Sequence, residues 1–179
     1  EIISWLEDGK NIALVTDAGT PGISDPGGML IQEIVKSVIP TEVEGSLNPR
    51  SIRDSSTPLR SAQNDSGGTI VPIPGPSAVI AALSISGFPT GKFIFMGFPP
   101  HKNKRQKYFK EVAASEYTAV FYESGHRIKK CLGELREYLD PKRKVMICRE
   151  LTKKFETIYR GTIEEVSEVM QDERGEFVV

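Results

Sequence analysis

The strongest constraint on the fold is a repeated order of short apolar run, glycine- or proline-rich loop and helical segment. Residues 11–16 (NIALVT) and 70–73 (IVPI) are short apolar runs of the kind that form buried strands. Each run leads into a loop and then into a segment with helical spacing, at 28–36 and 77–85. Alternating strands and helices predict an α/β fold with a parallel sheet.

The second half of the chain continues this alternation. Ser124 precedes a segment whose apolar residues recur at helical spacing, from Ile128 to Leu139. Thr162 and Glu165 form the spacing of a capping box at the start of another helix. We predict a further helix at 103–114 and strands at 93–95, 119–122, 145–148, 157–160 and from 177 onward.

One segment does not follow this alternation of strands and helices. Residues 37–69 contain 7 Ser and 3 Pro, and their apolar positions follow neither a helical nor a strand period. A structureless connection of this length is uncommon inside a compact domain. We therefore predict a disordered insertion over about 38–68.

Composition narrows the class of protein. Hydrophobic residues make up 39% of the 179 residues, enough for a core, and no apolar run approaches the ~20 residues of a membrane helix. The first ten residues do not resemble a signal peptide. The only cysteines, Cys131 and Cys148, are too few for a disulfide scaffold or a zinc site. These features predict a soluble, cytoplasmic protein without a metal.

Charge is distributed unevenly along the chain. Residues 1–88 carry 5 Lys and Arg against 10 Asp and Glu, whereas residues 89–179 carry 18 against 14. A basic half of this kind often faces a polyanion. An uneven but simply solvated surface is the alternative.

Two loops are candidates for ligand binding. The loop at 17–28 (DAGTPGISDPGG) begins with Asp17 at the carboxyl end of a predicted strand, where open α/β sheets bind ligands. It matches neither a P-loop nor a dinucleotide fingerprint, and a structural turn capped by Asp17 is the alternative. In the loop at 74–78, Ser77 begins a helix whose N–H groups favour an anionic group, and Ala78 leaves room for a flat ligand. Plain helix capping is the alternative for Ser77.

Two further loops place charged side chains after predicted strands, at 122–127 (YESGHR) and 149–154 (RELTKK). Glu123 and Glu150 are candidate bases, and Arg127, Arg149 and Lys153 are candidate anion contacts. Each fits an ordinary surface position when taken alone. Four such loops together favour one shared cleft.

Five ordered blocks carry a family resemblance. They are LVTDAGTPGISDPG (14–27), VPIPGPSAVIAALSISG (71–87), FIFMGFPP (93–100), VFYESGHRI (120–128) and RELTKKFE (149–156). Together they resemble the tetrapyrrole-methylase-like (class III) S-adenosylmethionine-dependent methyltransferases. Within that family they are most similar to the branch that methylates a cytidine ribose 2′-OH in small-subunit ribosomal RNA.

The resemblance implies two α/β domains, with the cofactor in the cleft between them, and usually a homodimer. It places 1–88 in a first, parallel-sheet domain and 89–179 in a second domain with a mixed sheet. The family's opening strand and its E-D-T-R motif would precede Glu1, so the first domain is expected to be incomplete. The last strand also stops early.

The resemblance also assigns roles to residues. The expected cofactor is S-adenosylmethionine, and the partners are small-subunit ribosomal RNA and the 30S subunit. Removal of the 2′-OH proton would fall to Glu150, Lys153 or Glu123, with no metal required. A tetrapyrrole C-methyltransferase and a catalytically incomplete rRNA-binding fragment are the alternatives. The residues implied for the cofactor are Asp17, Ala18, Gly19, Thr20, Ser77, Ala78 and Tyr122, and those for RNA are Lys102, Lys104, Arg105, Lys107, Arg127 and Arg149.

Overall fold

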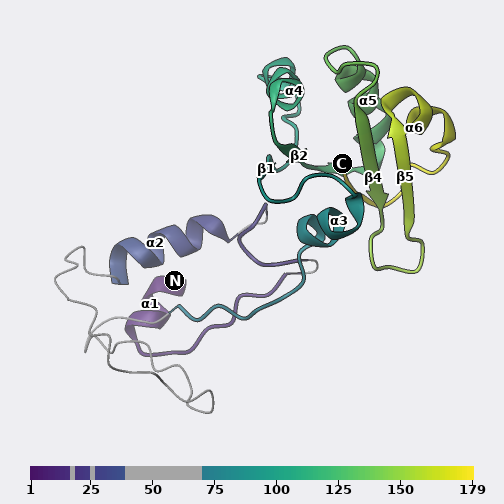
Figure 1. Cartoon of the computed structure of the whole chain (residues 1–179). Helices are drawn as coiled ribbons and strands as arrows, with labels where there is room; N and C mark the ends of the chain where they lie inside the picture. Colours follow the sequence, from purple (N-terminus) through teal and green to yellow (C-terminus); the bar gives the residue numbers. More distant parts are fainter. Residues whose placement is uncertain (17–18, 25–26, 39–69) are drawn as a thin grey trace. The chain divides into compact units, whose positions relative to one another are not determined.

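The computed structural model describes residues 1–16, 19–24, 27–38 and 70–179, which form two compact units, Glu1–Gly75 and Pro76–Val179 (Figure 1). The predicted insertion at 38–68 lies almost entirely outside the described residues. The helix that follows Ser77 belongs by its contacts to the second unit. The domain boundary expected after Phe88 stays a prediction about the family's domains.

The first unit contains helices α1 (Ile2–Glu7) and α2 (Gly28–Val38), the second of which matches the helix predicted at 28–36. The strands predicted at 11–16 and 70–73 are wrong: these residues form no strand. A strand needs a hydrogen-bonded neighbour, and the described residues of this unit offer none. Ile12, Val15 and Ile73 consequently remain exposed.

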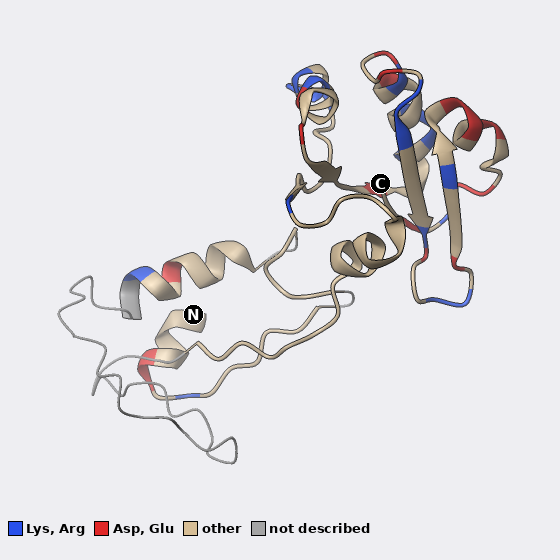
Figure 2. Ribbon diagram, in the orientation of Figure 1, with Lys and Arg blue, Asp and Glu red and all other residues tan. Residues whose placement is uncertain are grey.

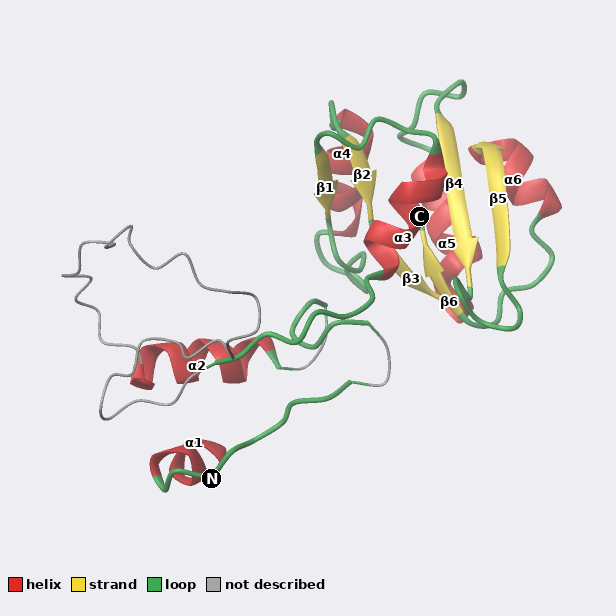
Figure 3. Ribbon diagram, turned by 60° about the horizontal axis from the view of Figure 1, so that its bottom comes forward, coloured by secondary structure: helices red, strands yellow, loops and turns green. Residues whose placement is uncertain are grey.

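The second unit is built on a sheet with the strand order β3-β6-β4-β5, in which all neighbours are antiparallel. A second pair, β1 and β2, runs parallel beside it (Figure 3). The strands are β1 (Phe93–Phe95), β2 (Thr118–Val120), β3 (Tyr122–Ser124), β4 (Lys144–Arg149), β5 (Thr157–Thr162) and β6 (Glu176–Val178).

Phe121 joins the two sheets. It separates β2 from β3, and its backbone exchanges two hydrogen bonds of 2.9 Å with Val179 at the end of β6. The parallel pair therefore continues into the antiparallel strands, and the expected mixed sheet is confirmed.

Both faces of this sheet are covered, because successive side chains of a strand point to opposite faces. Phe121 and Ile147 pack with helices α4 (Arg105–Ala114), α5 (Gly125–Arg136) and α6 (Ile163–Val169). Their neighbours Val120 and Met146 pack with α3 (Ala78–Ser86) on the other face.

The helices begin and end where the sequence predicts, within two residues in most cases. In α5 the predicted apolar stripe is fully buried, from Ile128 to Leu135, and Leu139 just beyond the helix is buried as well. The capping box of α6 is present, with the Glu165 backbone donating to Thr162 Oγ1. None of the described helices is long and apolar enough to cross a membrane.

Candidate functional site

The start of α3 is one centre of the predicted site. Ser77 caps this helix, and its Oγ accepts a long hydrogen bond of 3.5 Å from Ile80 N–H. Ala78, one residue on, is half-buried and packs with Tyr122 against the same apolar cluster. Three predicted cofactor residues from two separate loops therefore meet at one end of α3.

Tyr122 is held between two aromatic rings. Its ring centroid lies 4.9 Å from that of Phe95 and 5.5 Å from that of Phe98. Burial raises the pKa of the Tyr122 hydroxyl, while a hydrogen bond with the Val79 backbone opposes that shift. The hydroxyl thus stays neutral at physiological pH beside the first turn of α3.

The first predicted cofactor loop belongs to the other unit. Gly19 has a φ of 74°, a left-handed conformation that favours glycine. A Cβ atom on Gly75 would lie 4.0 Å from Thr20 Oγ1, so Gly75 and Thr20 lie near each other within the first unit. Asp17 and Ala18 lie outside the described residues.

Glu123 is the most deeply buried of the predicted catalytic residues. Its side chain is 0% exposed and lies between two guanidinium groups, with Arg127 Nε 3.3 Å from Oε1 and Arg105 Nη1 3.8 Å from Oε2. Ser124 N–H also donates to Oε1 at 2.8 Å. The carboxylate is therefore compensated inside the protein and faces no open surface.

Both arginines of this cluster are also tied to the backbone before α4. Arg105 donates to Pro100 O at 2.9 Å and pairs with Glu134, and Arg127 donates to Pro99 O. Arg105 is 7% exposed. Its charge is occupied within the fold, which favours a structural role over the predicted contact with RNA phosphate.

Two buried polar atoms that lack a hydrogen bond lie in the same region. Among the described side chains, Glu123 Oε2 and the Tyr108 hydroxyl are buried without a hydrogen-bond partner. Burial raises the pKa of Tyr108, and it raises the pKa of the Cys131 thiol to about 12, with the Glu123 carboxylate adding to both shifts. Tyr108 and Cys131 therefore stay neutral around Glu123.

Glu150 and Lys153 form a turn after β4. Lys153 Nζ lies 3.1 Å from Glu150 Oε1 and 2.7 Å from Glu176 Oε2, and Glu176 N–H donates to Glu150 Oε1 at 2.9 Å. Glu150 has a φ of 49°, an uncommon left-handed conformation for a side chain of this size. Both predicted residues thus share one partly exposed ion-pair group.

Electrostatics keeps both groups of this turn charged. Hydrogen bonding from the Glu176 backbone, followed by Lys153, lowers the pKa of the Glu150 carboxyl. A hydrogen bond to the Glu176 side chain, followed by that to Glu150, raises the pKa of Lys153. At neutral pH the turn presents a carboxylate and an ammonium group.

Arg149 points away from solvent. It is 7% exposed and donates to Arg174 O at 2.6 Å and Phe155 O at 3.1 Å, while Nη2 pairs with Asp172 at 2.9 Å. It fastens the turn to the segment before β6. Sequence reasoning missed Asp172, because no local spacing links it to a residue 23 positions earlier.

The predicted basic run at the start of α4 divides into two kinds of residue. Lys102, Lys104 and Lys107 are exposed, and Figure 2 shows Lys and Arg gathered on this helix. Lys107 pairs with Glu111 at 3.7 Å, whereas Lys102 and Lys104 reach no described carboxylate within 4.0 Å. These three lysines are available to a polyanion in a way that Arg105 is not.

Comparison with known proteins identifies the family. The model of the Tetrapyrrole (Corrin/Porphyrin) Methylases matches residues 55–167, more than half of the chain. The chain belongs to the tetrapyrrole methylase family. This tetrapyrrole methylase chain also superposes on a crystal structure of the methyltransferase CobJ with a TM-score of 0.61, at 21% identity over 99% of this chain and 67% of the other. That likeness confirms the α/β fold predicted from the sequence.

Curated relatives of this tetrapyrrole methylase share the name Ribosomal RNA small subunit methyltransferase I. The proteins of Xylella fastidiosa and Bacillus subtilis are each 38% identical over 99% of this chain, and that of Escherichia coli O157:H7 is 37% identical over 99%. The matches cover 56%, 51% and 54% of those proteins. The chain thus spans about half the length of the curated relatives it matches.

Proposed function

We propose that this chain is part of an S-adenosylmethionine-dependent methyltransferase that modifies a cytidine ribose 2′-OH in small-subunit ribosomal RNA. The observation that carries the proposal is the near-complete match, at 37–38% identity, to proteins named for methylation of that RNA. The blocks that resemble the rRNA-modifying branch include the turn at Glu150 and Lys153.

The start of α3 supports the choice of cofactor. The first N–H groups of a helix have no partner within the helix and favour an anion, which suits the carboxylate of a methionine moiety. Ala78 and the ring of Tyr122 provide a small residue and an aromatic face beside it. We assign cofactor contacts to Ser77, Ala78 and Tyr122, and to the loop from Asp17 to Thr20.

The methyl donor, when bound, supplies a methyl group activated by a sulfonium. The chain's own contribution is to orient the ribose oxygen and to accept its proton. Glu150 fits the acceptor because its carboxylate is partly exposed after β4. Lys153 fits a positioning cation because it stays protonated. Glu123 is the weaker candidate, since Arg105 and Arg127 already enclose it.

The exposed lysines at the start of α4 and just before it support the choice of substrate. Lys102, Lys104 and Lys107 would hold rRNA phosphates, and the 30S subunit is the proposed form of the substrate. We further propose a homodimer acting in the cytoplasm.

Methyl transfer from radiolabelled S-adenosylmethionine to 30S subunits that lack the modification tests this proposal. We expect label on a cytidine ribose, and Lys153→Met should reduce the rate of transfer far more than cofactor affinity. Lys154→Met is the matched control, because Lys154 is exposed next to it and lies over the ring of Phe155 at 5.6 Å. Label in a tetrapyrrole but not in RNA would refute the proposed substrate.

A binding experiment tests the RNA contacts separately. Replacing Lys102, Lys104 and Lys107 all by Gln should reduce the magnitude of the slope of log affinity against log salt by about 2–3. The reason is that the loss of three phosphate contacts reduces the number of counterions released on binding. Lys142→Gln, in the turn between α5 and β4, should change it by less than about 1. RNA binding without methyl transfer would support the reading of a catalytically incomplete fragment.

A further inference from the structure

Phe98 is an exposed aromatic residue in the loop that joins β1 to α4. It is 47% exposed and follows the carboxyl end of the parallel pair formed by β1 and β2. A single exposed apolar side chain is ordinary on a protein surface. Phe98 differs from that ordinary case because contacts from the protein interior fix the backbone around it.

Both neighbours of Phe98 are held in place. Gly97 has a φ of 64°, and its carbonyl oxygen accepts a hydrogen bond of 2.8 Å from Tyr122 N–H. Pro99, on the other side, is fully buried. The backbone of Phe98 therefore has little freedom to move, while its ring is presented at the surface.

The buried cluster of Glu123, Arg105 and Arg127 fastens the rest of this loop. Arg127 Nη2 donates to Pro99 O at 2.5 Å, and Arg105 Nη1 donates to Pro100 O at 2.9 Å. The Glu123 carboxylate, which is 0% exposed, lies beside both guanidinium groups. A loop held in this way loses little conformational entropy when a ligand binds, so it is preorganised for recognition.

The ring of Phe98 lies next to the ring of Tyr122. Their centroids are 5.5 Å apart, and the two ring planes are inclined at 56°. Because the planes are tilted, Tyr122 does not stack on Phe98, and a face of the Phe98 ring stays available to a flat ligand. Tyr122 belongs to the proposed cofactor contacts, so Phe98 borders the proposed site of methyl transfer.

Basic side chains follow Phe98 in the same loop. Lys102 and Lys104 are exposed, and so is His101, whose Nε2 lies 3.3 Å from Arg127 Nη1. Lys102 is four residues beyond Phe98, which is at most about 14 Å of extended chain. An exposed ring close to cations is typical of surfaces that bind single-stranded nucleic acid, where rings stack on bases and cations hold phosphates.

We propose that Phe98 is a stacking platform for an unpaired base of the RNA strand whose phosphates Lys102 and Lys104 hold. The inference rests on the proposed function, because it gives the substrate of that function a base contact. Stacking requires only the flat face of a base, so the platform contributes affinity and position without selecting a sequence. Its place beside Tyr122 puts the stacked base at or next to the nucleotide to be methylated.

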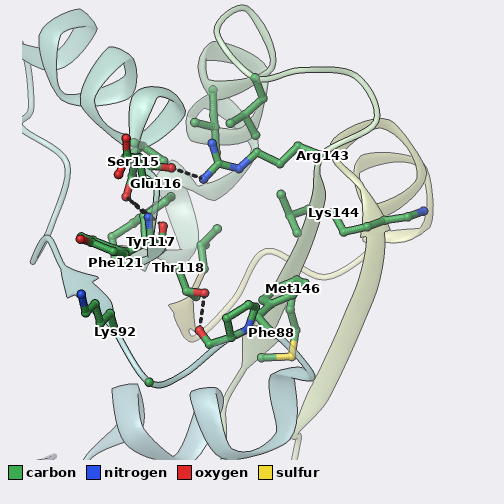
Figure 4. A pocket seen from close by; sticks show the side chains of 18 residues that line it. Phe88, Lys92, Ser115, Glu116, Tyr117, Thr118, Phe121, Arg143, Lys144 and Met146 are labelled. Carbon is green, nitrogen blue, oxygen red and sulfur yellow. Dashed lines mark hydrogen bonds between the residues drawn. The ribbon is translucent and has the colours of Figure 1, made fainter.

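Two substitutions of Phe98 separate stacking from plain apolar contact. Phe98→Leu keeps an apolar side chain and removes the flat ring, whereas Phe98→Tyr keeps the ring. Tyr117→Leu is the matched control, because Tyr117 is 41% exposed and its ring lies 5.5 Å from Lys92 Nζ. Figure 4 shows Tyr117 next to Thr118 at the amino end of β2, the end of the parallel pair opposite to Phe98.

The affinity for single-stranded oligocytidine RNA, measured by fluorescence anisotropy at several salt concentrations, is the readout, and thermal unfolding checks that each variant folds. Phe98→Leu should weaken binding about 5- to 150-fold without changing the slope of log affinity against log salt, because stacking releases no counterions. Phe98→Tyr and Tyr117→Leu should stay within about twofold of the unsubstituted chain. Equal affinities of Phe98→Leu and Tyr117→Leu would overturn the platform.

Calorimetry with S-adenosylmethionine distinguishes the other source of a flat base. If Phe98→Leu weakens cofactor binding and leaves RNA affinity unchanged, the ring stacks on the cofactor adenine and the proposal is overturned. Absence of RNA binding by the unsubstituted chain would overturn it as well.

The platform and the proposed function can fail separately. If RNA binding depends on Phe98 but 30S subunits accept no methyl group, the platform stands and the proposed methyl transfer is wrong. If the unsubstituted chain and Phe98→Leu methylate 30S subunits with the same kcat/KM, the proposed function stands and the platform is wrong.

Discussion

Replacing Glu123 with glutamine tests whether its carboxylate holds the second unit together. The substitution keeps the shape of the side chain and removes its charge. Arg105 and Arg127, whose side chains are only 8% and 15% exposed, would then lose their shared counter-charge. Removal of one partner from a buried ion pair costs about 3–5 kcal/mol, because the remaining charge stays desolvated.

Because both arginines keep other contacts, we expect a cost at the lower end of this range. Arg105 keeps Glu134 and Pro100 O, Arg127 keeps Pro99 O, and an amide oxygen can still accept from Ser124 N–H. We therefore expect a loss of about 3 kcal/mol in the free energy of unfolding. For a unit of this size, that loss lowers the melting temperature by at least about 12 °C.

Urea unfolding followed by circular dichroism measures the loss, and Glu134→Gln is the matched control. Glu134 also pairs with Arg105, but its side chain is 31% exposed, so its replacement should cost only about 0–1 kcal/mol. If Glu123→Gln costs no more than Glu134→Gln, the carboxylate does not stabilise the fold. It would then return as a candidate base for methyl transfer.

Four further substitutions test local features by thermal unfolding. Gly125→Ala should destabilise, because its Cβ would lie 2.1 Å from Glu173 O, whereas Gly133→Ala in the same helix meets nothing within 4 Å and should stabilise by about 0.5–1 kcal/mol. Thr162→Ala removes a helix cap and should cost about 1 kcal/mol; an unchanged melting temperature would contradict the capping box. Glu150 has a lowered pKa in the folded state, so its contribution should be complete above its unfolded pKa of ~4.3 and disappear as pH falls through the folded value. A wild-type-minus-Glu150→Gln difference that grows toward acidic pH would refute this sign.

The sequence alone determined most elements of the second unit, because local periodicity and capping specify them. The exception is β3 (Tyr122–Ser124), which the sequence assigned mostly to a loop. The apolar stripe from Ile128 to Leu135 and the Thr162 capping box formed as predicted. Each depends on residues three or four apart, which the chain brings together whenever it becomes helical. The strand–loop–helix order also predicted the α/β class correctly.

The tertiary structure decided which predicted strands form and which charged side chains are buried. The apolar runs at 11–16 and 70–73 have strand-like sequences, yet strands require neighbours, and no sequence period states whether a neighbour is present. Likewise, the spacing of Glu123 and Arg105 could not reveal that they are buried together, because they come from different elements. Arg105 and Arg127, which the sequence assigned to RNA contacts, instead form ion pairs with Glu123 inside the protein. A buried charge is stable only beside an opposite charge.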